Sequence, residues 1–315
     1  MLRLGVLSIV LLLTLAPVFQ INCLAFNAGT WKTAQTIQPF YYGQFAKEQV
    51  KVFSFTNPAD QKTALLAGTL DICGTTLAHA IHSASQGQPV VVVAALCNKC
   101  SAFVTRVDGS VNSVADLKGK KIGYVPGTMH EILLRESLVR NGLSPEKDVR
   151  LTRVDFFDMG LALARGGIEA FVSGEPFPTL AVINGYGKIM SYPYYGESIG
   201  TINAGMLVKR DTIEKNPDLV LAMINAHAKA TQYLNKNPDT WLKKASEFGT
   251  PLKVLEAASS NMELAWDMDE NFIRKTRALG ERMQALGLIK QQPDYDRLFD
   301  LNFVKKVKAE IGQTQ

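Results

Sequence analysis

The chain has 315 residues, 47% of them hydrophobic, with a formal net charge of +5 at pH 7 and a mean hydropathy of +0.03. This apolar content excludes a disordered chain, and the length favours two domains over one. The basic residues are scattered rather than gathered in runs that would follow a phosphate backbone, so nucleic acid is not expected as a partner.

The N-terminus carries an export signal. A short positive start at residues 1–3 precedes an almost wholly apolar stretch at 4–18. This is typical of a secretory signal peptide, predicted for residues 1–25, and is short for a membrane span, although an uncleaved anchor is an alternative. Lipid anchoring at Cys23 is a further alternative, but the residues before it fit a lipobox poorly. No later segment is long and apolar enough to span, so the mature protein is expected in the periplasm.

The first part of the chain alternates between strand and helix signals. Short apolar runs indicate strands, and Gly or Pro residues mark the ends of the helices between them. The predicted elements are strands at 24–30, 50–55, 70–76 and 89–96, and helices from Asn57-Pro58 to Gly68 and from Thr75-Thr76 to about Gly87. The valine-rich run at 89–96 is typical of a parallel strand covered on both faces. This order of elements is that of an α/β sheet.

A second cycle of the same kind follows. Its predicted elements are a short helix in "VADLKG", strands at 121–125, 149–155 and 168–173, and helices at 129–140, at 157–165 and after Glu175-Pro176. Turns at Pro126-Gly127, Asn141-Gly142 and Gly166-Gly167 separate these elements. A second α/β lobe is therefore expected.

One phrase occurs in both lobes: "ALLAGTLD" begins at Ala64 and "ALARGGIE" begins at Ala162. In each copy a helix is predicted to end at glycine, and a buried strand then begins beside an acidic residue. Ala, Leu and Gly are common, but the order of the surrounding elements favours equivalent helix-to-strand joints in two lobes of like design.

After "NAGMLVKR" at 203–210 the pattern becomes helical. A long helix is predicted at 218–235, a second begins at Asn237-Pro238, and a third lies in "PLKVLEAASSNMELAW". No further strand is predicted, and the helices are expected to pack back on the first lobe. The predicted lobes are 26–105 plus 205–315, and 106–204, with crossovers near 105–107 and 199–204.

Four stretches resemble the type II periplasmic solute-binding proteins of ABC importers, in the branch of nitrate, sulfonate and taurine binders that includes binders of thiamine pyrimidine precursors. They are "ALLAGTLDICGTT" with "QGQPVVVVAAL", "LKGKKIGYVPGTMHEILLRESLVRNGL", "LALARGGIEAFVSGEPFPTLA" and "VKRDTIEKNPDLVLAMINAHAKATQYLNKNPD". They cover most of the chain after residue 60. The segment "WKTAQTIQPFYYGQFAKEQ" departs from the family in lacking its usual Gly-Leu, and the family usually has no CxxC after the fourth strand.

The resemblance implies a two-lobed α/β fold in which each lobe is a mixed, mainly parallel sheet flanked by helices. It implies a monomeric binding protein, without catalysis or cofactor, that captures a small organic or inorganic anion and delivers it to a membrane permease. A sulfonate, nitrate, an aromatic acid and a thiamine precursor all fit. The alternative is an enzyme of the same fold, similar to the pyrimidine synthases that use His and Cys around iron.

The candidate ligand contacts lie where strands give way to helices. Ligands of open α/β sheets sit beyond the carboxyl ends of the strands, where helix N-termini offer free N–H groups to an anion. The candidates are Trp31, Thr33, Thr75, Thr76, Gly127 and Thr128, joined by Asp158 and, through the resemblance, Glu175. The threonines and acids could instead serve only as helix caps. The aromatic side chains of Tyr41, Tyr42 and Phe156 could add a stacking floor, or simply fill the core.

Cys97 and Cys100 form a CxxC pair, with Cys73 near another strand end of the same lobe. A disulfide between Cys97 and Cys100 is the favoured prediction for an exported protein, although Cys73 could pair with either. Alternatively, the thiols face the cleft and select a soft ligand, such as a sulfur compound or a metal. A metal held by Cys97, Cys100 and His79 is the weaker case, because no second CxxC or zinc-finger spacing is present. No metal site is therefore predicted.

Overall fold

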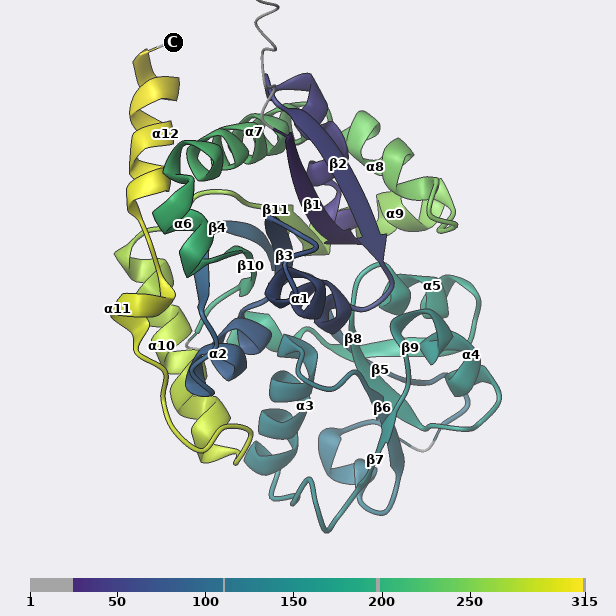
Figure 1. Cartoon of the computed structure of the whole chain (residues 1–315). Coiled ribbons are helices and arrows are strands. Elements are labelled where there is room, and N and C mark those ends of the chain that lie inside the picture. The colour runs from purple at the N-terminus through teal and green to yellow at the C-terminus, as the bar shows by residue number, and fades with distance from the viewer. Residues whose placement is uncertain (1–24, 110, 197–198, 314–315) are drawn as a thin grey trace, which may run out of the picture.

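The computed structural model describes residues 25–109, 111–196 and 199–313. The predicted signal peptide, except for Ala25, lies outside the described residues, and so does Cys23. Two mixed β-sheets lie one above the other in Figure 1, each flanked by helices, so the predicted two-lobed α/β fold is confirmed. Within the described ranges, none of the helices combines the length and apolar character needed to cross a bilayer.

The first sheet has six strands in the order β11-β4-β10-β3-β1-β2. They are β1 (Ala25–Trp31), β2 (Gln49–Phe55), β3 (Ile72–Thr76), β4 (Val90–Lys99), β10 (Ile202–Lys209) and β11 (Met262–Leu264). Strands β1, β2 and β3 run parallel, and β10 runs antiparallel between β3 and β4. Trp31 and Thr76, the last residues of β1 and β3, therefore lie at the same end of the sheet.

Helices cover both faces of the first sheet and continue along its side (Figure 1). They are α1 (Pro58–Leu66), α2 (Leu77–Ser85), α6 (Arg210–Lys215), α7 (Pro217–Lys236), α8 (Pro238–Ser246), α9 (Leu252–Ala258), α10 (Glu270–Ala285), α11 (Tyr295–Leu298) and α12 (Asn302–Gln313), with 3-10 helices η1 (Ala34–Thr36), η2 (Gln38–Gln44) and η6 (Ser259–Asn261). The side chain of Asn57 caps α1 by accepting the N–H of Ala59 at 2.8 Å. Helices α11 and α12 pack on β4 of the first sheet.

The second sheet has five strands in the order β7-β6-β8-β5-β9. Its elements are β5 (Ser101–Arg106), η3 (Val114–Leu117), β6 (Lys121–Tyr124), α3 (Met129–Arg140), β7 (Arg150–Arg153), η4 (Phe156–Asp158), α4 (Met159–Ala164), β8 (Ala170–Gly174), α5 (Phe177–Ile183), β9 (Gly187–Ser191) and η5 (Pro193–Gly196). Strands β7, β6 and β8 run parallel, whereas β5 is antiparallel to both of its neighbours. Separate apolar clusters cover the two faces of this sheet.

The chain passes from one sheet to the other between β4 and β5 and returns between β9 and β10. Lys99 and Cys100 make the first crossover with φ angles of 62° and 76°, a left-handed conformation that costs a non-glycine residue about 1–2 kcal/mol. Ser101 pairs with Gly174, so residues 101–105 lie in the second sheet rather than in the predicted first lobe. The second crossover ends at Ile202, within the predicted range.

Two strand predictions need correction. The run at 89–96 forms β4 and is buried on both faces as predicted, but its ladder partners β10 and β11 are antiparallel to it. Strand β11 follows α9, where only helix was predicted, because residues 262–264 pair with the end of β4. The two copies of the repeated sequence phrase form equivalent helix-to-strand joints, as predicted. Helix α1 leads through Gly68 into β3, and α4 leads through Gly166 into β8, with both glycines at positive φ.

Candidate functional site

A cavity lies where the two sheets face each other and encloses about 370 Å³ of empty space, including its open mouth. Its walls come from strand ends and following loops of both sheets: Trp31, Thr33, Gln35, Pro58, Thr76, Cys97, Cys100, His130, Phe156, Gly174, Glu175, Phe177 and Asn203.

Four of the eight predicted ligand contacts line this cavity, and four lie elsewhere. Trp31, Thr33, Thr76 and Glu175 are in its wall. The four outside it are Thr75, Gly127, Thr128 and Asp158. Thr75 is buried and donates to the carbonyl of Pro58 at 3.2 Å, and Asp158 is exposed at the start of α4. The structure therefore brings the predicted contacts after β1, β3 and β8 together in one cavity, and the contacts predicted after β6 lie outside it.

The chain's own side chains bind some of the backbone amides at the helix N-termini near the cavity. The hydroxyl of Thr76 accepts the N–H of His79 at 3.3 Å at the start of α2. At α3, Thr128 accepts the N–H of Glu131 at 3.4 Å, and the Glu131 carboxylate accepts the N–H of Gly127 at 2.7 Å. These three amides are among the groups that were expected to meet an anion, and they have internal partners.

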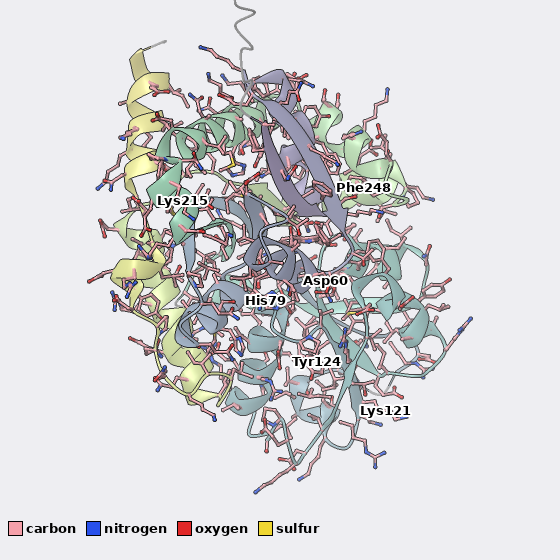
Figure 2. The ribbon with its side chains drawn as sticks, viewed as in Figure 1. Asp60, His79, Lys121, Tyr124, Lys215 and Phe248 are labelled. Carbon is pink, nitrogen blue, oxygen red and sulfur yellow. The ribbon has the colours of Figure 1, made fainter. Side chains whose placement is uncertain are left out.

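Gly127 contributes to the contact between the two halves. A Cβ added to it would lie 2.3 Å from Nε2 of His79, and its carbonyl accepts the Thr76 hydroxyl at 3.3 Å. Figure 2 shows His79 near the middle of the molecule, between the parts that hold the two sheets. His79 therefore packs against the second lobe and lies outside the cavity wall.

Glu175 brings a carboxylate to the cavity from the end of β8. Its side chain is 2% exposed; one oxygen accepts the N–H of Thr179 at 3.1 Å, and the other accepts Nδ2 of Asn261 at 3.5 Å. Burial raises the pKa of this carboxyl above its ordinary value, and these hydrogen bonds offset part of that effect. No described Lys or Arg forms an ion pair with Glu175, so a ligand that donates to this carboxylate would stabilise its charge.

Aromatic rings form the wall beside Glu175. Phe156 and Phe177 stack with ring centroids 5.9 Å apart and an interplanar angle of 16°, and His130 meets Phe156 edge-on. Burial lowers the pKa of His130 to about 3, so its imidazole is neutral near pH 7. Trp31 lines the cavity from the end of β1. These rings favour a flat ligand.

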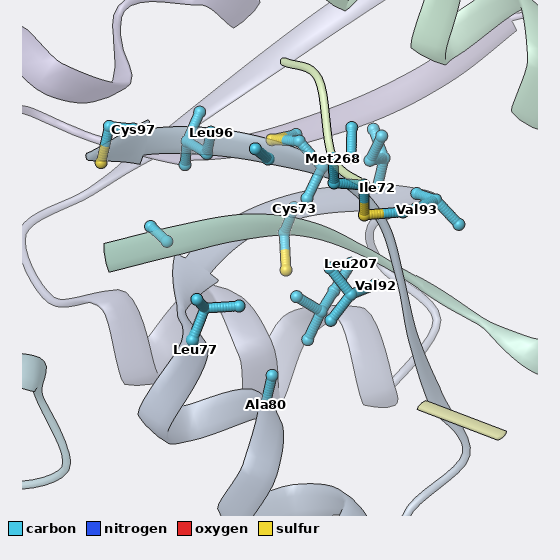
Figure 3. Packing of buried hydrophobic residues seen from close by; sticks show 14 of the residues in the cluster. Ile72, Cys73, Leu77, Ala80, Val92, Val93, Leu96, Cys97, Leu207 and Met268 are labelled. Carbon is cyan, nitrogen blue, oxygen red and sulfur yellow. The ribbon is translucent and has the colours of Figure 1, made fainter. Parts of the chain in front are cut away.

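The described cysteines Cys73, Cys97 and Cys100 are free thiols, which contradicts the predicted disulfide. Figure 3 shows Cys73 among apolar side chains of the first sheet, whereas Cys97 lies at the end of its strand. Cys97 and Cys100 both line the cavity, and burial raises the pKa of both thiols. Among the described residues, no group of three or more His, Cys, Asp or Glu side chains could hold a metal ion.

Residues 41–241, more than half of the chain, match the protein family described as NMT1/THI5 like. The chain belongs to this family. The match spans β2 to the start of α8 and so includes most of the cavity wall, although Trp31, Thr33 and Gln35 precede it.

Three comparisons place this NMT1/THI5-like chain among known proteins. A Haemophilus influenzae protein named for thiamine biosynthesis is 26% identical over 255 residues, which cover 76% of this chain and 78% of the relative. The 4-amino-5-hydroxymethyl-2-methylpyrimidine phosphate synthase of Schizosaccharomyces pombe is 30% identical over 106 residues, which cover 33% of this chain and 30% of that enzyme. The alkanesulfonate-binding protein SsuA of Xanthomonas axonopodis pv. citri, solved with MOPS, superposes with a TM-score of 0.77 at 18% identity, covering 88% of this chain and 98% of that one, and shares its fold.

The cavity of this NMT1/THI5-like protein also uses residues that the sequence did not single out as site candidates. Gln35 donates from Nε2 to the carbonyl of Glu175, which joins η1 to the end of β8. Asn203 and His130 enter the wall from β10 and α3, and Phe177 enters at the start of α5. A weak signal was present for Asn203, because it opens the "NAGMLVKR" stretch after which the helical pattern begins.

Replacing Thr128 with Ala is expected to lower the free energy of unfolding by about 1 kcal/mol and to leave ligand affinity unchanged. Thr128 is fully buried, donates to the carbonyl of Val125 at 2.8 Å and caps α3, so its loss weakens the helix rather than the cavity. Urea unfolding and calorimetric titration of the same preparation measure the two quantities. A tenfold loss of affinity with unchanged stability would show instead that Thr128 contacts the ligand.

Proposed function

We propose that this chain is the solute-binding component of an ABC importer, working outside the cytoplasmic membrane as a monomer without a cofactor. Its ligand is a small, flat molecule that donates hydrogen bonds, of the thiamine pyrimidine precursor type. The proposal rests most on one observation: the cavity presents acceptors, including the Glu175 carboxylate, and none of the described residues in its wall is Lys or Arg.

The charges around the cavity favour a donor ligand over an oxyanion. None of the described residues that line the cavity is Lys or Arg, and Glu175 supplies a carboxylate there. A nitrate or sulfonate placed beside that carboxylate would meet a like charge without a compensating cation. Of the ligand classes that the sequence left open, an aminopyrimidine fits best, because it stacks on Phe156 and Trp31 and donates to Glu175. The names of two relatives point to thiamine and to a pyrimidine.

Delivery to a permease requires that the lobes close on the ligand, and several contacts hold them together here. Arg282 on α10 and Glu136 on α3 form an ion pair at 2.8 Å, and both side chains are mostly buried. The Gln35 contact with Glu175 and the Thr76 contact with Gly127 lie on the cavity side of the same interface. These contacts support a closed form, and we place the hinge at the two crossovers.

A thermal-shift screen tests the proposed ligand class. We expect 4-amino-5-hydroxymethyl-2-methylpyrimidine at a hundred times its Kd to stabilise the protein by about 2.7 kcal/mol, a shift of several degrees. Sodium nitrate and ethanesulfonate are expected to give no shift beyond that of sodium chloride at the same ionic strength. A shift with either oxyanion and none with the pyrimidine would contradict the proposed ligand.

Replacing Arg282 with Ala is expected to weaken pyrimidine binding by about fivefold to thirtyfold, corresponding to roughly 1–2 kcal/mol. The variant loses an ion pair between the two lobes, so the closed form should become less populated and apparent affinity should fall with it. Small-angle scattering should show a larger radius of gyration for the ligand-free variant than for the wild type.

The matched control is Lys308→Ala, because Lys308 pairs with Asp267 at 2.7 Å on the surface of the first lobe alone. It should change neither radius nor affinity. Equal radii and equal affinities for Arg282→Ala and the wild type would contradict closure through this contact.

One observation favours a second candidate, an enzyme that makes a pyrimidine. His130, Cys97 and Cys100 line the cavity, and one relative is a pyrimidine phosphate synthase. The described side chains do not form a metal-holding group, so no metal-dependent step is derived for them. Mass spectrometry of the small molecules present after prolonged incubation of the protein in a metabolite extract separates the candidates: no newly formed pyrimidine supports binding, and a pyrimidine absent from the original extract supports the enzyme.

A further inference from the structure

We propose that Asn203 determines the specificity of the cavity, with its side-chain amide fixed so that Oδ1 serves as a hydrogen-bond acceptor for the ligand. Cys97 and Cys100 are positioning residues that hold the amide in this orientation. The inference deepens the proposed function and rests on it: the ligand must bring one donor hydrogen to Asn203 and another to Glu175.

The two ends of the Asn203 amide have opposite surroundings. Nδ2 lies 3.0 Å from Sγ of Cys100, 3.3 Å from the carbonyl oxygen of Lys99 and 3.8 Å from Sγ of Cys97. Oδ1 has no hydrogen-bond partner among the described residues, although Asn203 is only 3% exposed. A buried acceptor without a partner is unfavourable unless a ligand or water supplies the missing hydrogen.

The orientation of this amide follows from chemistry. A backbone carbonyl can only accept a hydrogen bond, so the amide atom that faces the oxygen of Lys99 must be the NH₂ group. With the amide reversed, Oδ1 would face that oxygen and the two would repel. The carbonyl oxygen of Lys99 therefore settles which end of Asn203 is left without a partner.

The crossover between the sheets explains why the Asn203 amide is held in this orientation. Lys99 and Cys100 are both left-handed, with φ of 62° and 76°, and the structure holds this unfavourable turn next to the cavity. The turn presents the carbonyl of Lys99 and the thiol of Cys100 to the same Nδ2. The turn also accounts for the CxxC spacing, because it places both sulfurs beside one amide as acceptors, and they form no disulfide.

The acceptors come from opposite sheets. Asn203 enters the cavity from β10 of the first sheet, and Glu175 enters from the end of β8 in the second. The wall between them includes Gly174, where a Cβ would lie 2.8 Å from Nε2 of His130 and 3.1 Å from Sγ of Cys100. A ligand that donates to both acceptors would bridge the two lobes, and one that offers an acceptor at either point would be rejected.

Calorimetric titration with two pyrimidines tests the assignment. The first probe is 4-amino-5-hydroxymethyl-2-methylpyrimidine, and the second is its 4-oxo analogue, in which an acceptor replaces the amino donor. We expect the wild type to prefer the amino probe at least tenfold. Asn203→Leu, which keeps the branched shape and removes the acceptor, should lower affinity for the amino probe at least tenfold and reduce the preference to less than threefold.

The cysteines provide variants that leave Asn203 in place. Cys100→Ala removes an acceptor for Nδ2 and should reduce the preference between the probes, whereas Cys100→Ser keeps an acceptor and should retain it. Cys73→Ala is the matched control, because Cys73 is equally buried but lies outside the cavity wall, and its preference should equal that of the wild type. Thermal unfolding of each variant confirms that it is folded before titration.

The outcomes are distinct. A wild type that binds the amino probe, with Asn203→Leu or Cys100→Ala retaining the full preference, overturns the role of Asn203 and leaves the proposed function standing. A wild type that binds neither probe contradicts the proposed function, and this inference with it. The inference is supported if Asn203→Leu and Cys100→Ala both lose the preference for the amino probe and Cys100→Ser retains it.

Discussion

Replacing Glu175 with Gln is expected to weaken binding of the amino pyrimidine by about 10- to 150-fold and to leave the unliganded protein at least as stable near pH 7. The loss corresponds to a hydrogen bond to a charged group, roughly 1.5–3 kcal/mol. The effect on stability follows from linkage. A raised pKa means that the folded protein disfavours the charged form of Glu175. The charged side chain therefore destabilises the fold increasingly as pH rises from the pKa of the unfolded chain to the raised pKa of the folded one. Gln removes that cost and still accepts one of the two hydrogen bonds.

The matched control for this prediction is Glu131→Gln. Glu131 is also a buried carboxylate near a helix N-terminus, but it pairs with Arg135 at 2.9 Å and lies outside the cavity wall. Its replacement should lower stability and leave affinity unchanged, which is the opposite result on both measurements. Urea unfolding and calorimetric titration at pH 7 provide the comparison. A Glu175→Gln variant that binds like the wild type would remove Glu175 from the ligand site.

Acid is expected to unfold the protein steeply between about pH 6 and pH 4. Burial lowers the pKa values of His79 and His130 to about 3 and that of His227 to about 4. Above about pH 6.5 these histidines are neutral in both states, and below it the unfolded chain takes up protons that the folded chain does not. Each histidine then removes up to about 1.4 kcal/mol of stability per pH unit. The raised pKa of Glu175 acts in the opposite direction, but it is one group against three.

His227 offers the cleanest test of this acid sensitivity, because it is fully buried and lies outside the cavity wall. Its Nε2 lies 2.8 Å from the carbonyl oxygen of Ala95 and must donate, so Nδ1 accepts the hydroxyl of Tyr42 at 2.9 Å. His227→Gln should lower stability at pH 7 but flatten its fall between pH 6 and pH 5. Half-exposed His82→Gln should leave the slope nearly as it is. Equal stability of the wild type at pH 7 and pH 5 would refute the prediction.

Local signals in the sequence predicted the elements well. Helix α3 has the predicted bounds, Met129 to Arg140, because a capping Thr precedes it and Asn-Gly follows it. Pairing between distant strands left weaker signals. Strand β11 has only three residues, and β4 is apolar throughout whether its neighbours run parallel or antiparallel. The directions of its partners depend on contacts that no local pattern records.

The site residues differ in the same way: those at strand exits could be predicted from local signals, and Asn203 could not. Trp31, Thr76 and Glu175 stand at strand exits, where the chemistry of α/β sheets points. Asn203 stands near the beginning of its strand, and reaches the cavity only because β10 runs antiparallel beside β3 and β4. The disulfide was predicted from the CxxC spacing and the expected export of the protein, whereas the left-handed turn at Cys100 directs both thiols to the Asn203 amide.

Isothermal titration calorimetry of the wild-type protein tests the central claim most directly. The claim is that the cavity takes a flat molecule that donates hydrogen bonds to Glu175 and Asn203. Titration with 4-amino-5-hydroxymethyl-2-methylpyrimidine should give one site per chain, with an affinity that falls as pH drops below the raised pKa of Glu175. Saturable binding of nitrate or ethanesulfonate, with no heat from the pyrimidine at any pH between 6 and 8, would contradict it.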